Sequence, residues 1–267
     1  MHRQNNFSFG MPYLLELSDL PAGIDLCRRL SLSFLELNSN FPDSAVSALD
    51  PALLIKTREE YGLSFTLHLD DSMSIADTNP YVREAYLKTS LEAIDFCKTV
   101  DIPTINIHFS KGNIVTLPDG PHYIFDHYRE EFHANLISYR KAVEEAIGTS
   151  PIKVAIENTN GWDAHELIGI DLLLESPVFG LTLDIGHDHA VKNKDLPYFE
   201  SHKDRLCHMH AHDGWDKTNH QTLGSGEIPL HDRLKMAREA GARVVLETKT
   251  IRALEDSVTW LKKEGWM

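Results

Sequence analysis

Short runs rich in β-forming residues alternate with longer amphipathic segments along the chain, and this order constrains the fold more than any other feature. The runs that we predict to be strands are Tyr13–Leu17, Ser33–Asn38, Ser64–Leu69, Thr104–Phe109, Lys153–Asn158, Gly180–Ile185, Leu206–Ala211 and Arg243–Thr248. The predicted helices are Pro21–Leu30, Pro51–Tyr61, Pro80–Thr99, Phe125–Ile147, Ala164–Glu175, Leu196–Lys203, Pro229–Ala240 and Ile251–Lys263. Repeated strand-then-helix units are typical of α/β proteins with a parallel sheet, either open or closed into a barrel.

The polar residues within these runs fall on one parity, which favours the barrel. In the third run Thr66 and His68 alternate with Phe65 and Leu67, and the later runs repeat this pattern. Since successive side chains of a strand point to opposite faces, each strand has one apolar and one polar face. An open doubly wound sheet needs two apolar faces. We therefore predict a (β/α)8 TIM barrel, with residues 1–267 as a single domain.

Length and charge set further limits. A chain of 267 residues, 42% of them hydrophobic, can bury the core of one barrel domain. No apolar stretch approaches the length of a membrane helix, and Cys27, Cys97 and Cys207 are too widely spaced for a disulfide framework. We expect a cytoplasmic protein with no membrane partner. The formal charge of -14 argues against nucleic acid as a partner, since phosphate binding needs a basic face.

Imidazole or carboxylate side chains are the last residues on the polar faces of six successive predicted strands. They are His68, His108, Glu157, Asp184, His210 and Glu247. In a barrel these strand ends converge at one mouth, where three carboxylates repel one another unless a cation neutralises them. The mixed nitrogen and oxygen donors predict a divalent metal ion such as Mn, Zn, Co or Mg. Taken singly, each residue has a structural explanation, such as a hydrogen-bonded core histidine, a paired glutamate or, for Asp184, a helix cap.

The ordered set of motifs resembles the xylose isomerase-like TIM barrel superfamily, which includes sugar isomerases, epimerases and endonuclease IV. The segments that carry the resemblance are Leu67-His68, Asn106-Ile107-His108, Ile156-Glu157-Asn158-Thr159, Thr182-Leu183-Asp184-Ile185-Gly186-His187, His210-Ala211-His212-Asp213, Leu223-Gly224-Ser225-Gly226-Glu227-Ile228 and Leu246-Glu247. The resemblance implies that Glu157, Asp184, His210 and Glu247 hold one metal ion. It also implies that Glu157 and Glu247 act as the catalytic acid and base.

Endonuclease IV is similar in a further group of positions. The resemblance implies additional metal or substrate contacts at His68, His108, His187 and His220. In endonuclease IV an aspartate two residues before the last of these histidines completes a third zinc site. Thr218 occupies that position here, and Asp216 is off-register, which puts a complete third site in doubt. His220 then either binds a substrate hydroxyl or phosphate, or is a surface loop residue.

Several residues at strand ends or in loops near the predicted mouth have two interpretations each. Trp162 and Trp215 either wall a sugar pocket or pack against the core. Glu16 and Glu36 either contact substrate or are paired core glutamates. Lys111 and Lys249 either meet a phosphate or oxyanion or are solvated.

The function that these patterns favour is metal-dependent isomerisation or epimerisation of a small sugar or sugar phosphate, by proton transfer between Glu157 and Glu247. The alternative is endonuclease IV-like, zinc-dependent hydrolysis of a phosphodiester in abasic DNA. A third class is a metal-stabilised barrel without catalysis. The expected partner is a small carbohydrate, and exposed barrel helices allow a homo-oligomer.

Overall fold

The computed structural model describes residues 6–159 and 161–267 and has the predicted closed parallel barrel. The barrel strands are β1 (Ser8–Pro12), β2 (Phe34–Asn38), β3 (Ser64–His68), β4 (Thr104–His108), β7 (Lys153–Glu157), β8 (Phe179–Asp184), β9 (Leu206–Ala211) and β12 (Arg243–Leu246). They are hydrogen-bonded in the order β1, β12, β9, β8, β7, β4, β3, β2. This order follows the chain around the ring, as repeated strand-helix units require.

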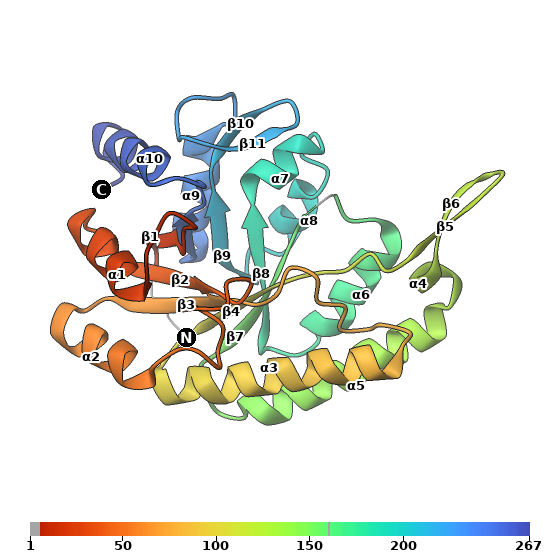
Figure 1. Ribbon diagram of the computed structural model, residues 1–267. Helices are drawn as coiled ribbons and strands as arrows, with labels where there is room; N and C mark the ends of the chain where they lie inside the picture. Colours follow the sequence, from red (N-terminus) through yellow and green to blue (C-terminus); the bar gives the residue numbers. More distant parts are fainter. Residues whose placement is uncertain (1–5, 160) are drawn as a thin grey trace.

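Helices follow the barrel strands and surround them (Figure 1). Their bounds are α1 (Leu20–Arg29), α2 (Pro51–Tyr61), α3 (Pro80–Val100), α4 (Ile124–His127), α5 (Arg129–Ile147), α6 (Ala164–Leu174), α7 (Ile185–Ala190), α8 (Leu196–Ser201), α9 (Leu230–Ala240) and α10 (Ile251–Lys263). Within the described residues, none of these helices combines the length and apolar character that crossing a membrane requires.

The barrel interior is polar, which confirms the predicted parity, and much of it is hydrogen-bonded. Thr182 Oγ1 donates to Asn106 Oδ1 at 2.5 Å, and the Asn106 amide donates to Glu157. Thr66 Oγ1 donates to Glu36 Oε2 at 3.0 Å. All five residues are at most 3% exposed. Buried polar groups are tolerated when they are hydrogen-bonded, so this network can support a polar site at the mouth.

The first strand differs from the prediction. The strand is Ser8–Pro12, in which Ser8 to Gly10 pair with β12 and Gly10 to Pro12 pair with β2. The predicted strand Tyr13–Leu17 lies in the following loop. Tyr13 and Leu14 are buried because that loop packs them against the core, whereas Leu15 is 81% exposed. A short apolar run looks the same in the sequence whether a buried loop or a buried strand contains it.

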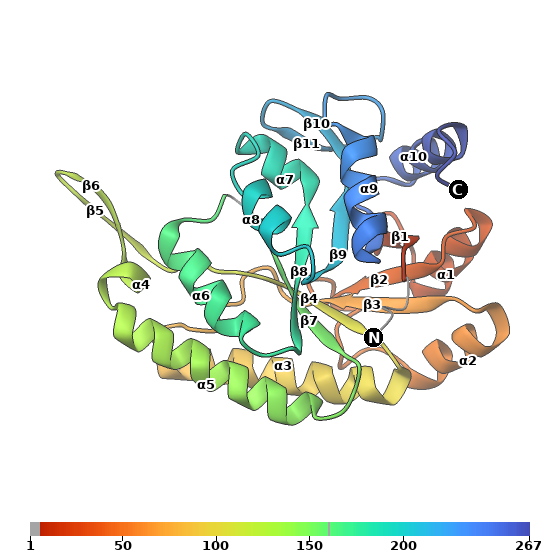
Figure 2. The same ribbon diagram turned by 180° about the vertical axis from the view of Figure 1, so that it is seen from behind.

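The loops contain further elements that the periodicity did not predict. The expected helix Phe125–Ile147 is divided at Tyr128 into α4 and α5. Two hairpins, β5 (Ile114–Leu117) with β6 (Gly120–Tyr123) and β10 (Asp213–Trp215) with β11 (Thr218–Gln221), lie outside the barrel sheet. Figures 1 and 2 show that β5 and β6 project away from the barrel. Strands of three or four residues are too short to show a reliable alternation.

Candidate metal centre at the barrel mouth

The structure brings the four residues that we predicted as metal ligands together. Glu157 ends β7, Asp184 ends β8, His210 lies in β9 and Glu247 directly follows β12. Their ligand atoms all lie within 4.8 Å of one another. Glu157, Asp184 and His210 are buried, and the Glu247 side chain is 15% exposed. The closed barrel places them together because β8 and β9 lie between β7 and β12 in the ring.

His210 Nδ1 is the centre of this group. It lies 3.1 Å from Glu157 Oε1, 3.4 Å from Glu247 Oε2 and 3.9 Å from Asp184 Oδ2. Within the described residues, Glu247 Oε2 and both ring nitrogens of His210 are buried without a hydrogen bond. Such atoms are costly, and a cation between His210 Nδ1 and Glu247 Oε2 would satisfy those two. One imidazole and three carboxylates also form a donor set that suits a divalent transition metal. The residues present therefore fit a divalent metal ion.

The pKa shifts at this site also favour a bound cation. Burial disfavours the charged form of His210, but Glu157, Glu36 and Glu247 outweigh it and raise its pKa well above the ordinary value. Burial would raise the pKa of Glu157 and of Glu247, yet His210 holds both pKa values well below the usual range. Both glutamates are thus anionic and need a neighbouring positive charge. A divalent cation would supply that charge more fully than a protonated imidazole.

The second oxygen of Glu157 faces another pair of predicted site residues. Its Oε2 lies 3.3 Å from His68 Nε2 and 3.5 Å from His108 Nε2. Burial opposes protonation of His68, but Glu157 outweighs it and raises the pKa of His68 to about 9. Asp71, in the loop after β3, lies 3.6 Å from His68 Nδ1 and 4.0 Å from His108 Nε2. Asp71 was not predicted because an irregular loop has no periodicity to mark it.

His212 is a second residue of the site that was not predicted. Its Nε2 lies 3.0 Å from Asp184 Oδ1, and its Nδ1 accepts the His220 backbone N–H at 2.7 Å. Nε2 therefore carries the proton, and His212 holds the Asp184 carboxylate in place. The His212 ring also requires Gly186, where an added Cβ would lie 1.8 Å from a ring carbon. The parity that His212 shares with His208 and His210 was the available signal.

His187 and His220 lie beside this group. Their ring centroids are 5.5 Å apart, and His220 Nδ1 lies 3.8 Å from Glu247 Oε2. Asp184 also caps α7, since its Oδ1 accepts the His187 N–H at 2.6 Å. The helix-cap reading of Asp184 and its place in the metal group are therefore compatible. Thr218, where a third zinc site would need an aspartate, is exposed in β11.

The Leu-Gly-x-Gly-x-Ile motif at 223–228 has a structural explanation. The buried Asp213 carboxylate accepts the N–H groups of Gly224, Gly226 and Ile228 at 2.9, 2.9 and 3.2 Å. An added Cβ at Gly226 would lie 2.3 Å from the Gly214 carbonyl oxygen. These contacts hold the loop against the β10–β11 hairpin, which carries His220.

A cavity of about 550 Å³ opens above the metal group, a volume within the ordinary range for small-molecule sites. Among the residues that line it are His68, His108, Glu157, His187, His220 and Glu247, together with Asp71, Lys111 and Lys249. In the described part of the chain, the lining includes neither Trp162 nor Trp215. Trp162 is a core residue stacked on Phe199 with centroids 5.3 Å apart, and Trp215 is 45% exposed. The packing reading therefore holds for Trp162.

The remaining charged residues have structural partners. Glu16 was predicted to lie in a strand but lies in the loop after β1, and its Oε2 accepts the Ile251 N–H at the start of α10 at 2.6 Å. Glu36 is a paired core glutamate, with Oε1 3.0 Å from His210 Nε2 and Oε2 2.8 Å from His208 Nε2. Lys111 Nζ lies 3.2 Å from Asp163 Oδ2, and Lys249 Nζ lies 2.8 Å from Glu247 Oε1. Both lysines border the cavity while their charges are paired.

A pH-dependent stability is expected from Asp188, which supports the loop between α7 and α8. Its Oδ1 accepts the N–H groups of Asp195 and Leu196, but burial raises its pKa from 3.8 to about 6. The folded state therefore binds a proton more tightly than the unfolded state, so stability is lost as pH rises through this window. Asp188→Asn keeps the accepting oxygen without the charge. We expect it to stabilise the protein by roughly 1–3 kcal/mol at about pH 8 and to be near neutral at about pH 4.

Urea unfolding of Asp188→Asn at several pH values measures this difference. The control is Asp95→Asn, at an exposed position of α3, which should show no pH-dependent change. An Asp188→Asn variant that is less stable than wild type at about pH 8 would show that the charged form is favoured in the fold.

Comparison with known proteins agrees with this architecture. A sequence profile described as "Xylose isomerase-like TIM barrel" matches residues 24–264. An uncharacterized protein of Methanocaldococcus jannaschii is 25% identical over 226 residues, which cover 81% of this chain and 78% of that protein.

Two solved structures share the fold over almost their whole length. A D-tagatose 3-epimerase-like protein has a TM-score of 0.79 and 22% identity, covering 96% of each chain. The IolI protein, solved with a binding zinc atom, has a TM-score of 0.74 and 14% identity, covering 97% of this chain and 96% of that one. The profile match spans most of the sequence, and the closed barrel carries the motifs at its mouth. The chain belongs to the xylose isomerase-like TIM barrel family.

Proposed function

We propose that the protein is a divalent-metal-dependent isomerase or epimerase of a small sugar or sugar phosphate. The observation that carries this proposal is the arrangement of Glu157 and Glu247. Each directs one oxygen toward His210 Nδ1, at 3.1 and 3.4 Å, and both line the cavity. Two carboxylates that approach one cavity from different strands can act on two faces of a bound substrate.

The residues of the chain have distinct parts in this reaction. A bound divalent cation would polarise the carbonyl and the adjacent hydroxyl of the sugar and so lower the pKa of the C–H on the hydroxyl-bearing carbon next to the carbonyl. One glutamate removes the proton from that carbon, and the other returns a proton, to the opposite face in an epimerisation. Asn106 donates to Glu157 and Lys249 pairs with Glu247, so both carboxylates are held in place. The His187 and His220 rings border the cavity, where they can donate to sugar hydroxyls.

The names of the structural relatives support the same class of chemistry. One is a D-tagatose 3-epimerase-like protein and another was solved with a zinc atom. The buried unpaired His210 Nδ1 and Glu247 Oε2 support metal binding in this chain.

The test is to incubate the metal-loaded protein with free and phosphorylated ketoses and aldoses in D2O and to follow the products by NMR. We expect conversion of at least one sugar with deuterium entering next to the carbonyl, because the proton passes through an exchangeable carboxyl group. Conversion without solvent deuterium would instead indicate an internal hydride shift, with the glutamates as ligands only.

Hydrolysis of abasic DNA is the second candidate. It is favoured by two further groups of possible ligands, His68 with Asp71 and His108, and His212 with His220 and Glu247. A multinuclear zinc site needs such groups. Thr218 in place of the expected aspartate and the formal charge of -14 count against it.

We therefore expect no incision, or very slow incision, of an abasic-site duplex at low salt with zinc supplied. Gel analysis of an end-labelled duplex measures it. Rapid incision that a chelator stops, and that His108→Ala abolishes, would replace the isomerase proposal with the hydrolase.

A further inference from the structure

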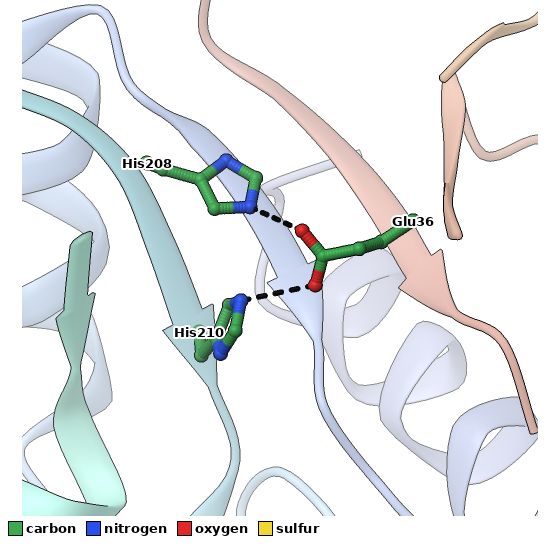
Figure 3. A group of neighbouring side chains, drawn as sticks. All are labelled: Glu36, His208 and His210. Atoms are coloured by element: carbon green, nitrogen blue, oxygen red, sulfur yellow. Dashed lines mark hydrogen bonds and ion pairs between the residues drawn. The ribbon is translucent and has the colours of Figure 1, made fainter. Parts of the chain in front are cut away.

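Glu36 is a buried carboxylate below the metal group that the proposed reaction does not use. It lies in β2, is 3% exposed, and is not among the described residues that line the cavity. Figure 3 shows its two oxygens directed toward two histidines of β9. Oε1 lies 3.0 Å from His210 Nε2 and Oε2 lies 2.8 Å from His208 Nε2. Burying a charged carboxylate is costly, so the two histidine contacts of Glu36 must compensate for its loss of hydration.

The His210 ring lies between Glu36 and the candidate metal ligands. Its Nε2 lies 3.0 Å from Glu36 Oε1 in an ion pair without hydrogen-bond geometry, and its Nδ1 lies 3.1 Å from Glu157 Oε1. A neutral imidazole has one N–H and one lone pair, so a carboxylate at Nε2 places the proton there and leaves the lone pair on Nδ1. The His68 ring stacks on His210 with centroids 5.7 Å apart and an interplanar angle of 28°, which limits rotation of the ring.

We propose that Glu36 is a positioning residue that selects the Nδ1-ligating form of His210, and so sets the affinity of the site for its metal. This inference rests on the proposed function for the metal, but not on the identity of the sugar. A carboxylate hydrogen-bonded to the far nitrogen of a ligating histidine fixes the ring and increases the basicity of the ligating nitrogen. Removing such a partner typically costs 10–100-fold in metal affinity.

His208 and Thr66 keep the Glu36 carboxylate in the orientation that this role requires. Within the described residues, His208 Nδ1 is buried without a hydrogen bond, so the proton is expected on Nε2, which donates to Glu36 Oε2. Thr66 Oγ1 donates to the same oxygen at 3.0 Å. With Oε2 held from two sides, Oε1 is directed at His210. The three side chains come from β2, β3 and β9, so only the closed barrel assembles them.

The variant that tests this role is Glu36→Gln, which keeps the size of the side chain. An amide has one oxygen acceptor and one NH2 donor, so it cannot accept from both histidines. We expect the Kd for Zn²⁺, measured by competition with a chromophoric chelator, to rise about 10–100-fold. The matched control is Glu59→Gln, the same change at an exposed position of α2 outside the site, and its Kd should stay within about threefold. A Glu36→Gln Kd within threefold of wild type would overturn the proposal.

A second measurement needs no variant. Long-range 1H–15N NMR of the Zn²⁺-loaded wild-type protein distinguishes the protonated, metal-bound and free nitrogens of each histidine. We expect His210 with a protonated Nε2 and a metal-bound Nδ1, and His208 with a protonated Nε2. Metal on His210 Nε2 would overturn the proposal even if Glu36→Gln fails to fold. If Glu36 had only a structural role, Glu36→Gln would change the unfolding midpoint but would leave the protonated and metal-bound nitrogens of His210 as in wild type.

These outcomes separate the role of Glu36 from the proposed function. If wild type binds Zn²⁺ with the expected histidine pattern but exchanges no sugar proton with D2O, the isomerase proposal fails and the role of Glu36 stands. If sugars are converted with deuterium entry while Glu36→Gln binds Zn²⁺ as wild type does, the role of Glu36 fails and the isomerase proposal stands.

Discussion

Replacing either Glu157 or Glu247 with Gln is expected to lower kcat for sugar conversion by about 10²–10⁴-fold, the usual contribution of general acid–base catalysis. Gln keeps the size of the side chain and one oxygen that can bind metal, but it cannot accept the substrate proton. Both glutamates line the cavity, Glu157 buried and Glu247 partly exposed, with one oxygen each near His210 Nδ1. Substrate binding should therefore survive better than turnover, so KM should change less than kcat.

The measurement is kcat and KM for each variant, with metal content determined on the same samples. Deuterium entry from D2O should be lost in both variants. The control is Glu200→Gln, at an exposed position of α8, which should leave both constants unchanged. Turnover at the wild-type rate in both Gln variants would remove the catalytic assignment, and loss of metal in either would leave that residue as a ligand only.

Removing the metal is expected to abolish sugar conversion and to lower the melting temperature. A ligand that binds only the folded state contributes roughly 2.7 kcal/mol at a hundredfold excess over its Kd. For a domain of this size, each kcal/mol corresponds to about 2–4 °C in Tm, so chelation should lower Tm by about 5–10 °C. In this structure the loss would leave Glu157 with His210 at 3.1 Å, and Glu247 with Lys249 at 2.8 Å and His210 at 3.4 Å, as their neighbouring positive charges.

Differential scanning calorimetry before and after chelation, with elemental analysis of both samples, measures this effect. Adding the metal back should restore both Tm and turnover. His210→Ala should bind metal weakly and show little response to chelator. Equal melting curves for samples shown to have lost their metal would contradict a metal site at His210.

The barrel could be predicted because its pattern is local. Side chains such as Thr66 and His68 share a face simply because they are two residues apart in a strand. The same reasoning failed at Tyr13–Leu17, where a loop buries Tyr13 and Leu14 and the strand is instead Ser8–Pro12. It also failed to mark the β10–β11 hairpin, whose strands have only three and four residues.

The candidate ligands were accessible to the same reasoning because each comes at the end of a strand. Once eight strands form a ring, Glu157, Asp184, His210 and Glu247 must meet at one mouth. Asp71 and His212 could not be predicted from strand ends, for different reasons. Asp71 lies in a loop whose path has no sequence period, and His212 needed a partner, Asp184, that only the assembled barrel identifies.

The sequence by itself thus determined which side chains face the barrel interior and which strand ends carry imidazole and carboxylate groups, because these depend on spacing along one strand. The tertiary structure alone decided which nitrogen of His210 faces the other ligands, since that depends on Glu36, 174 residues earlier in the chain. It also placed Trp162 in the core against Phe199 and away from the cavity. Contacts between distant segments are set by how the strands close and the loops fold, and no local period records them.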